Sequence, residues 1–145
     1  MIISRKSNPP KHPPVSFQGH SLKNDNQHKH LGVTLHSDLK WADHINEIVA
    51  KSGKLIRIIK SLKLKSLKFT LDLLTLKTIY TSFIRQVLEY GNPVWSGCTV
   101  LEAQKLESVQ LNAARTVTWV MHGTSNVKLY EELGWNTLAK RRDLF

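Results

Sequence analysis

The sequence predicts a mainly α-helical fold, in which a small N-terminal antiparallel β-hairpin or sheet precedes a three-helix bundle and short C-terminal helices. Two patterns predict it: residues 1–36 combine prolines, turn residues and alternating apolar positions, and from Trp41 the apolar period becomes about 3.6. The chain has 145 residues, which suits one small domain with a modest core. We expect a β-rich part over residues 1–37 and a helical bundle over residues 38–145.

The β-rich part begins with residues 1–4, which resemble the end of a strand. The prolines within residues 9–14 exclude a helix there and predict a connecting loop. Residues 15–17 alternate as a short strand, and the apolar residues 30–35 offer another after several turn formers. We expect these strands to form one small antiparallel sheet.

The first helix is expected over residues 41–62, where apolar positions recur on one stripe at about 100° per residue. Ser37 or Asp38 could cap its first amides. Basic side chains occupy the far side of this helix. The apolar stripe is Ile45, Ile48, Val49, Leu55, Ile56, Ile59 and Leu62, and the basic side holds Lys51, Lys54, Arg57 and Lys60.

A second amphipathic helix is expected over residues 72–90, and Gly91 followed by Pro93 should end it. Its Thr and Gln side chains share one half with Arg85 and Glu89, so the other half should be buried. The apolar half comprises Leu73, Leu76, Ile79, Tyr80, Phe83, Ile84, Val87 and Leu88.

A third helix should start at Thr99, because Thr99 and Glu102 have the spacing of a capping box. Gly123 is placed to stop it. Residues 127–133 predict a short helix closed by Gly134, and Asn136 or Thr137 could cap a last helix that reaches residue 145. The apolar stripe of the third helix is Leu106, Val109, Ala113, Val117 and Val120.

Charge gives the first functional indication. The chain has 21 Lys and Arg against 11 Asp and Glu, a formal charge of +10, which attracts polyanions such as nucleic acid. A basic surface can also serve solubility alone. The run Lys51, Lys54, Arg57, Lys60, Lys63, Lys65 and Lys68 contains no acid, which favours phosphate contact over a surface of paired charges. Contact with an anionic membrane is a weaker alternative, because the apolar stripe has two helices to pack on.

Several other classes of function are disfavoured. Cys98 is the only cysteine, charge follows Met1 within a few residues, and no run of ~18 apolar residues occurs, so we expect an intracellular protein without membrane contact. Catalytic motifs are missing and the five aspartates are scattered, so we expect no catalytic and no metal-binding residues. Six histidines lie among the first 44 residues, but their spacing matches no zinc pattern.

Two sets of side chains leave alternatives open. The four tryptophans and Tyr90 could stack on bases, but positions at helix ends and beside glycines favour core packing. The basic residues at 140–142 could grip phosphate or complement a helix end.

The segment "HKHLGVTLHSDLKWADHI" resembles the junction between palm and thumb in reverse transcriptases of animal non-long-terminal-repeat retrotransposons. "LKTIYTSFIRQVLEYGNPVWSG" resembles that family's thumb helix, and "LESVQLNAARTVTW" and "LYEELGWNTLAKRRD" resemble the helices that follow. The resemblance implies a palm remnant with a hairpin that supports the primer end, formed by Lys29, His30, Leu31 and Gly32. It also implies a thumb-like bundle whose Lys51, Lys54, Arg57 and Lys60 contact phosphates. The structural alternative is that Gly32 only relieves steric crowding where the strand meets the helix.

The resemblance also implies what this chain lacks. The family's Tyr-x-Asp-Asp turn and partner aspartate, which hold magnesium in the full-length enzyme, lie upstream of anything that resembles Met1. We therefore expect a fragment that needs no cofactor itself and is inactive alone, with a template–primer duplex and the missing palm and fingers as partners. The alternative is a stand-alone helical protein-interaction module, domesticated or degraded, without a nucleic-acid role.

Overall fold

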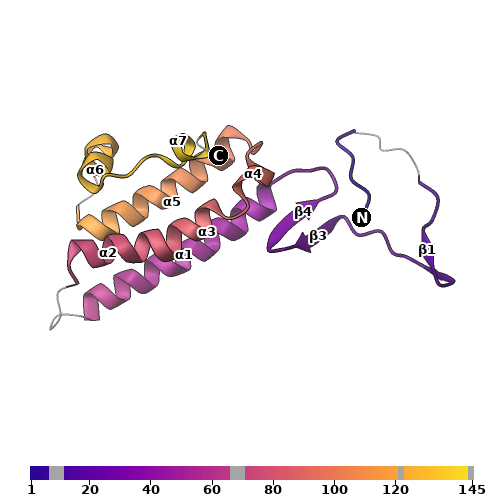
Figure 1. Ribbon diagram of the computed structural model, residues 1–145, viewed down its shortest axis with the longest axis horizontal. Helices are drawn as coiled ribbons and strands as arrows, with labels where there is room; N and C mark the ends of the chain where they lie inside the picture. Colours follow the sequence, from indigo (N-terminus) through magenta and orange to yellow (C-terminus); the bar gives the residue numbers. More distant parts are fainter. Residues whose placement is uncertain (7–11, 66–70, 121–122, 144–145) are drawn as a thin grey trace. The chain divides into compact units, whose positions relative to one another are not determined.

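The computed structural model describes residues 1–6, 12–65, 71–120 and 123–143, with the side chains of residues 63–65 excepted (Figure 1). The chain forms two compact units, Met1–His44 and Ile45–Phe145. Two small antiparallel hairpins occupy the first unit and helices the second, so the predicted fold class is confirmed.

The first unit contains two separate hairpins and not the single sheet that we expected. Strand β1 (Ser16–Phe17) pairs with β2 (His20–Ser21), and β3 (Gln27–His30) pairs with β4 (Val33–His36). The strand predicted at residues 1–4 is wrong: this segment forms no ladder, and its amide at Ser4 donates one hydrogen bond to the carbonyl of Ser37 (2.8 Å).

The continuous strand predicted over residues 30–35 is also wrong, because a turn at Leu31 and Gly32 divides it. Both residues have positive φ, +45° and +81°, as a two-residue type I′ hairpin turn requires. Glycine adopts this conformation without a steric penalty, whereas leucine rarely does. The apolar side chain of Leu31 suggested a strand, but its backbone forms the tip of the hairpin.

Hydrogen bonds hold the β3–β4 hairpin at its base and along β4. The amide of Ser37 donates to the carbonyl of Asn26 (2.8 Å), and the buried amide of Thr34 donates to Nδ1 of His44 (3.3 Å). The expected cap at Ser37 or Asp38 is wrong, since helix α1 begins at Ala42. Instead, Asp38 accepts a hydrogen bond from the Lys40 amide and pairs with its ammonium, which lowers the pKa of the Asp38 carboxyl.

The second unit is built around three helical rods (Figure 1). The first is α1 (Ala42–Lys65), the second joins α2 (Leu73–Ile79), the π-helical η1 (Tyr80–Ile84) and α3 (Arg85–Glu89), and the third is α5 (Val100–Thr118). The first and third rods run in the same direction and the second runs the opposite way. Three short helices complete the unit: α4 (Asn92–Trp95), α6 (Asn126–Leu133) and α7 (Leu138–Arg142).

The predicted apolar stripe of α1 is largely confirmed. Ile45, Ile48, Ile56 and Ile59 are all buried, with at most 4% of the side chain exposed. The predicted burial of Leu62 is wrong, since this residue is 49% exposed near the end of the helix.

In the second rod, the buried residues are spaced by four. Leu76, Tyr80, Ile84 and Leu88 are each at most 1% exposed. In a regular α-helix, a spacing of four drifts by about 40° at each step, so four such residues would not share one face. The π segment winds less per residue, through i→i+5 hydrogen bonds, and keeps them aligned. The predicted burial of Leu73 and Phe83 is wrong, since both are exposed.

The predicted helix ends were correct at some positions. The capping box of α5 is confirmed, with Glu102 accepting from the Thr99 amide (2.7 Å) and the Thr99 hydroxyl accepting from the Glu102 amide (3.3 Å). The stop at Gly123 is wrong, because α5 ends at Thr118 and is capped by Trp119, a left-handed residue with φ of +60°.

The structure defines the end of α6 and both ends of α7. Gly134 closes α6 in the left-handed conformation, as predicted. The hydroxyl of Thr137, and not Asn136, caps α7 by accepting from the Lys140 amide (3.2 Å). Helix α7 ends at Arg142, short of the predicted end at residue 145, which lies outside the described residues.

Candidate nucleic-acid interface

The basic stripe, which we define as Lys51, Lys54, Arg57 and Lys60, lies on the solvent side of α1. All four side chains are exposed. Residues three apart in an α-helix lie about 60° short of a full turn from each other. The four residues are therefore spread over about half of the circumference of α1. The basic stripe therefore crosses the outer surface of α1 obliquely and does not form a straight row. Of the longer predicted run, the side chains of Lys63, Lys65 and Lys68 lie outside the described residues.

Little in the described protein compensates the charge of the basic stripe. The ammonium of Lys60 donates to Oδ1 of Asn112 on α5 (3.3 Å), which is a neutral acceptor. Within residues 1–6, 12–65, 71–120 and 123–143, no ion pair forms between the basic stripe and an acid. The four cations therefore remain available to an anionic partner.

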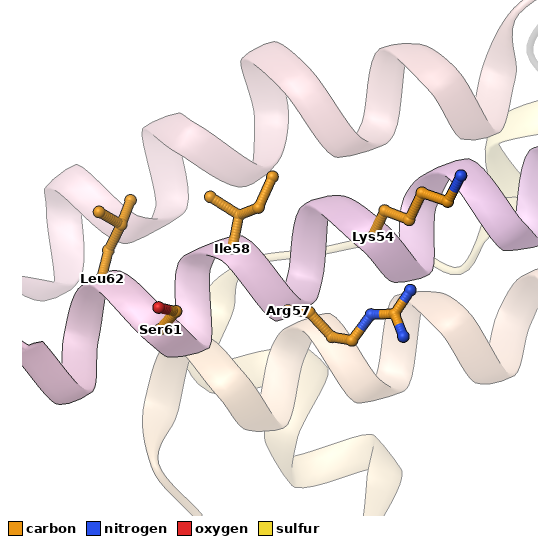
Figure 2. Close-up of a pocket in the computed structure, with 5 residues that line it drawn as sticks. All are labelled: Lys54, Arg57, Ile58, Ser61 and Leu62. Atoms are coloured by element: carbon orange, nitrogen blue, oxygen red, sulfur yellow. The ribbon is translucent and has the colours of Figure 1, made fainter.

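Apolar side chains lie directly beside the basic stripe. Figure 2 shows a shallow hollow on the outer surface of α1, around which Lys54, Arg57, Ile58, Ser61 and Leu62 are arranged. The alkyl stems of Lys54 and Arg57 both extend toward the N-terminal end of α1, as helix geometry directs long side chains. Ile58 is 54% exposed. Sequence reasoning did not single out Ile58, although its absence from the apolar stripe indicated an exposed position.

The predicted primer-grip-like residues gather at the tip of the β3–β4 hairpin. Lys29 and His30 end β3, and Leu31 and Gly32 form the turn; all four are exposed, Leu31 by 77%. The rings of His28 and His30 lie on one side of the strand with centroids 6.3 Å apart. This tip belongs to the first unit and the basic stripe to the second.

The described residues contain no group of three or more His, Cys, Asp or Glu side chains arranged to hold a metal ion. No helix in the same part of the chain combines the length and apolar character needed to cross a bilayer.

The aromatic side chains mostly pack in the interior. Trp41 and Trp95 are buried, and Trp135 stacks on Tyr80 with ring centroids 3.9 Å apart, so core packing is confirmed for these three tryptophans. It is wrong for Trp119, which is 60% exposed, and for Tyr90, which is 55% exposed.

Two of the three basic residues at 140–142 are engaged within the bundle. Arg141 forms a two-point ion pair with Glu89, in which Nε donates to Oε1 and Nη2 donates to Oε2 (3.0 Å). The guanidinium carbon of Arg142 lies 6.0 Å from the ring centroid of Trp95. These contacts favour a structural role for both arginines over a role in gripping phosphate.

Two curated proteins of Drosophila melanogaster are similar to this chain. One is described as a probable RNA-directed DNA polymerase from transposon X-element and is 25% identical over 121 residues, which are 83% of this chain and 13% of that protein. The other is described as a probable RNA-directed DNA polymerase from transposon BS and is 22% identical over 128 residues, which are 88% of this chain and 14% of that protein. The chain spans about one seventh of the length of these relatives.

No family model and no solved structure matches the chain. The two similarities support a relationship to the reverse transcriptases of transposons.

Proposed function

We propose that this chain is a part of a retrotransposon reverse transcriptase, comprising the end of the palm and the thumb, and that α1 binds the phosphates of a template–primer duplex. The observation that supports this proposal is the basic stripe, whose four exposed cations form no ion pair within the described residues. The similarity to RNA-directed DNA polymerases of transposons supplies the class of nucleic acid.

The binding is expected to be electrostatic and independent of base sequence. Lys and Arg side chains that contact phosphate release condensed counterions, and the observed affinity falls as the salt concentration rises. Four phosphate contacts correspond to a slope of about −3 to −4 in log K against log salt. Contacts of this kind position a duplex and carry no base readout.

The β3–β4 hairpin is proposed to support the primer end. Its exposed tip offers the Lys29 ammonium and, at Gly32, a backbone without a side chain that a nucleic-acid strand could approach closely. In this proposal the catalytic carboxylates and their magnesium ions belong to the palm and fingers of the longer protein. The chain alone is expected to bind duplex without extending a primer.

The test is a titration of a labelled RNA–DNA duplex with the purified chain, followed by fluorescence anisotropy between 50 and 200 mM salt. The double variant Lys54→Glu with Arg57→Glu is expected to weaken binding at least tenfold at the lowest salt concentration. The matched control is Lys23→Glu with Lys128→Glu, which makes the same change of charge at exposed positions outside α1. Equal losses in the two double variants, or no binding by the wild type, would contradict the proposal.

A second candidate is a protein-interaction module, and the exposed apolar pair Ile58 and Leu62 favours it. Such a module would bury these side chains against a partner and leave the cations at its rim. The double variant Ile58→Ser with Leu62→Ser separates the two functions. If α1 binds phosphates, this variant retains most of its affinity for the duplex and the salt dependence of that affinity. If instead the affinity for the duplex is lost in this variant and does not depend on salt in the wild type, the result favours the module.

A further inference from the structure

A small polar hollow lies in the helical unit, away from the residues assigned to the basic stripe. It measures about 50 Å³ and lies between the second rod, α5 and the segment that joins α6 to α7. Its lining includes Tyr80, Arg85, Gln110, Asn136 and Arg141. This volume admits a group of a few non-hydrogen atoms and is more than one water requires.

The π segment brings two of these residues together. The amide of Arg85 donates to the carbonyl of Tyr80, which closes an i→i+5 turn. In a regular α-helix, side chains five positions apart point about 140° away from each other. The wider turn lets both Tyr80 and Arg85 line the hollow. Single π turns inside helices often occur at functional sites.

One residue that lines the hollow carries a buried donor without an acceptor. Nε of Arg85 is buried and has no hydrogen-bond partner in the described protein. A guanidinium with a desolvated, unpaired N–H is costly, and such groups in native proteins are usually satisfied by water or by an ion. An acceptor that is not part of the described protein would satisfy this N–H.

Neither of the two neighbouring carboxylates supplies an acceptor to Nε of Arg85. Arg141 is paired with Glu89, the acid one helical turn after Arg85. The other nearby carboxylate, Glu107, accepts from the Tyr130 hydroxyl (2.6 Å) and from the Leu138 amide (3.0 Å). An oxyanion accepts from a guanidinium N–H in a charge-assisted hydrogen bond, which is stronger than the bond that a neutral water molecule accepts.

The neutral groups of the lining are already arranged around this position. The Tyr80 hydroxyl donates to Gln110, and Gln110 donates to the carbonyl of Asn136 (2.9 Å), so none of these groups supplies Arg85 with an acceptor. We propose that the hollow is a binding site for a small oxyanion such as phosphate, held by the guanidinium of Arg85. Neither the proposed duplex contacts nor the primer-grip-like hairpin uses this site.

The test compares thermal unfolding of the full chain in inorganic phosphate and in chloride at equal pH and ionic strength. Phosphate is expected to raise the Tm of the wild type by a few degrees, because a ligand that binds only the folded state stabilises it. Arg85→Gln should abolish this increment, while Lys128→Gln, which removes the same charge from an exposed position on α6, should retain it. Equal increments in all three proteins, or none in the wild type, would overturn the proposal.

A second variant tests the proposal even if Arg85→Gln fails to fold. Arg85→Lys keeps the charge on a slightly shorter side chain but removes the planar fork and its Nε–H, so phosphate affinity measured by ³¹P line broadening should fall about tenfold. Unchanged affinity in this variant would also overturn the proposal.

Two final arms identify the source of the oxyanion and separate this site from the duplex site. DNA strands with a 5′-phosphate or a 5′-hydroxyl test whether the ligand is the end of a strand. Where the free ion raises the Tm, an Arg85-dependent preference for the 5′-phosphate assigns the site to strand ends, and equal affinity for the two strands assigns it to the free ion. Lys54→Glu with Arg57→Glu should leave the increment with free phosphate unchanged, so the duplex proposal can fail while this one stands.

Discussion

The hydroxyl of Tyr80 donates a 2.7 Å hydrogen bond to Oε1 of Gln110, which joins the π segment of the second rod to α5. Both side chains are 1% exposed. Nε2 of Gln110 donates in turn to the carbonyl of Asn136 (2.9 Å), so one buried amide links three segments that are distant in sequence. This network holds together the part of the bundle that surrounds the proposed oxyanion site.

Removing the amide should therefore destabilise the bundle. Gln110→Leu leaves the Tyr80 hydroxyl and the Asn136 carbonyl without their partner, and we expect the free energy of unfolding to fall by about 1–3 kcal/mol. Urea denaturation measures the change. Gln104→Leu, at an exposed position of the same helix, is the matched control and should change stability by less than about 0.5 kcal/mol. Similar losses in both variants would refute a special role for Gln110.

Alkaline pH should destabilise the fold through two tyrosines. Burial raises the pKa of Tyr80 and of Tyr130 well above their ordinary value of 10.0. Above pH 10 the hydroxyls ionise in the unfolded chain but not in the folded one, so the stability present below pH 10 is lost as the pH rises. Urea denaturation at pH 9, 10 and 11 should show this decline. In Tyr130→Phe the decline should be shallower, and a wild-type stability that is constant over this range would contradict the prediction.

The capping box of α5 offers a local test. Thr99→Ala removes the hydroxyl that accepts from the Glu102 amide, and we expect a loss of about 1 kcal/mol in the free energy of unfolding. Thr99→Ser keeps an acceptor at this position and should be close to the wild type. The prediction fails if serine is as destabilising as alanine, since the effect would then not depend on the hydroxyl.

The turn of the β3–β4 hairpin should tolerate, and even favour, a change at Leu31. Leu31→Asn relieves a left-handed leucine and creates the Asn-Gly pair that suits a type I′ turn, so we expect the hairpin to gain about 0.5–1 kcal/mol. Gly32→Val forces a β-branched residue to φ of +81° and should destabilise it. Amide hydrogen exchange of β3 and β4 measures both effects. Leu22→Asn, at another exposed leucine, is the control and should leave this exchange unchanged.

The sequence by itself determined the elements whose signals are local. The apolar stripe of α1 followed from its period, the start of α5 from the spacing of Thr99 and Glu102, and the end of α6 from Gly134. The exposure of the basic stripe also followed, because residues opposite a buried stripe must face solvent. Its binding of phosphate stays a prediction, since charge and position alone name no ligand.

The tertiary structure decided the features that depend on contacts between distant residues. The π turn after Ile79, the left-handed backbone of Leu31 and Trp119 and the pairing of Arg141 with Glu89 have no unambiguous local signature. Periodicity averages over many residues and cannot detect one widened turn, and a local pattern cannot reveal which charge will be paired across a bundle. The unpaired Nε of Arg85 depends on both the widened turn and the pairing of the neighbouring charges, so only the packed helices could show that this arginine lines a hollow.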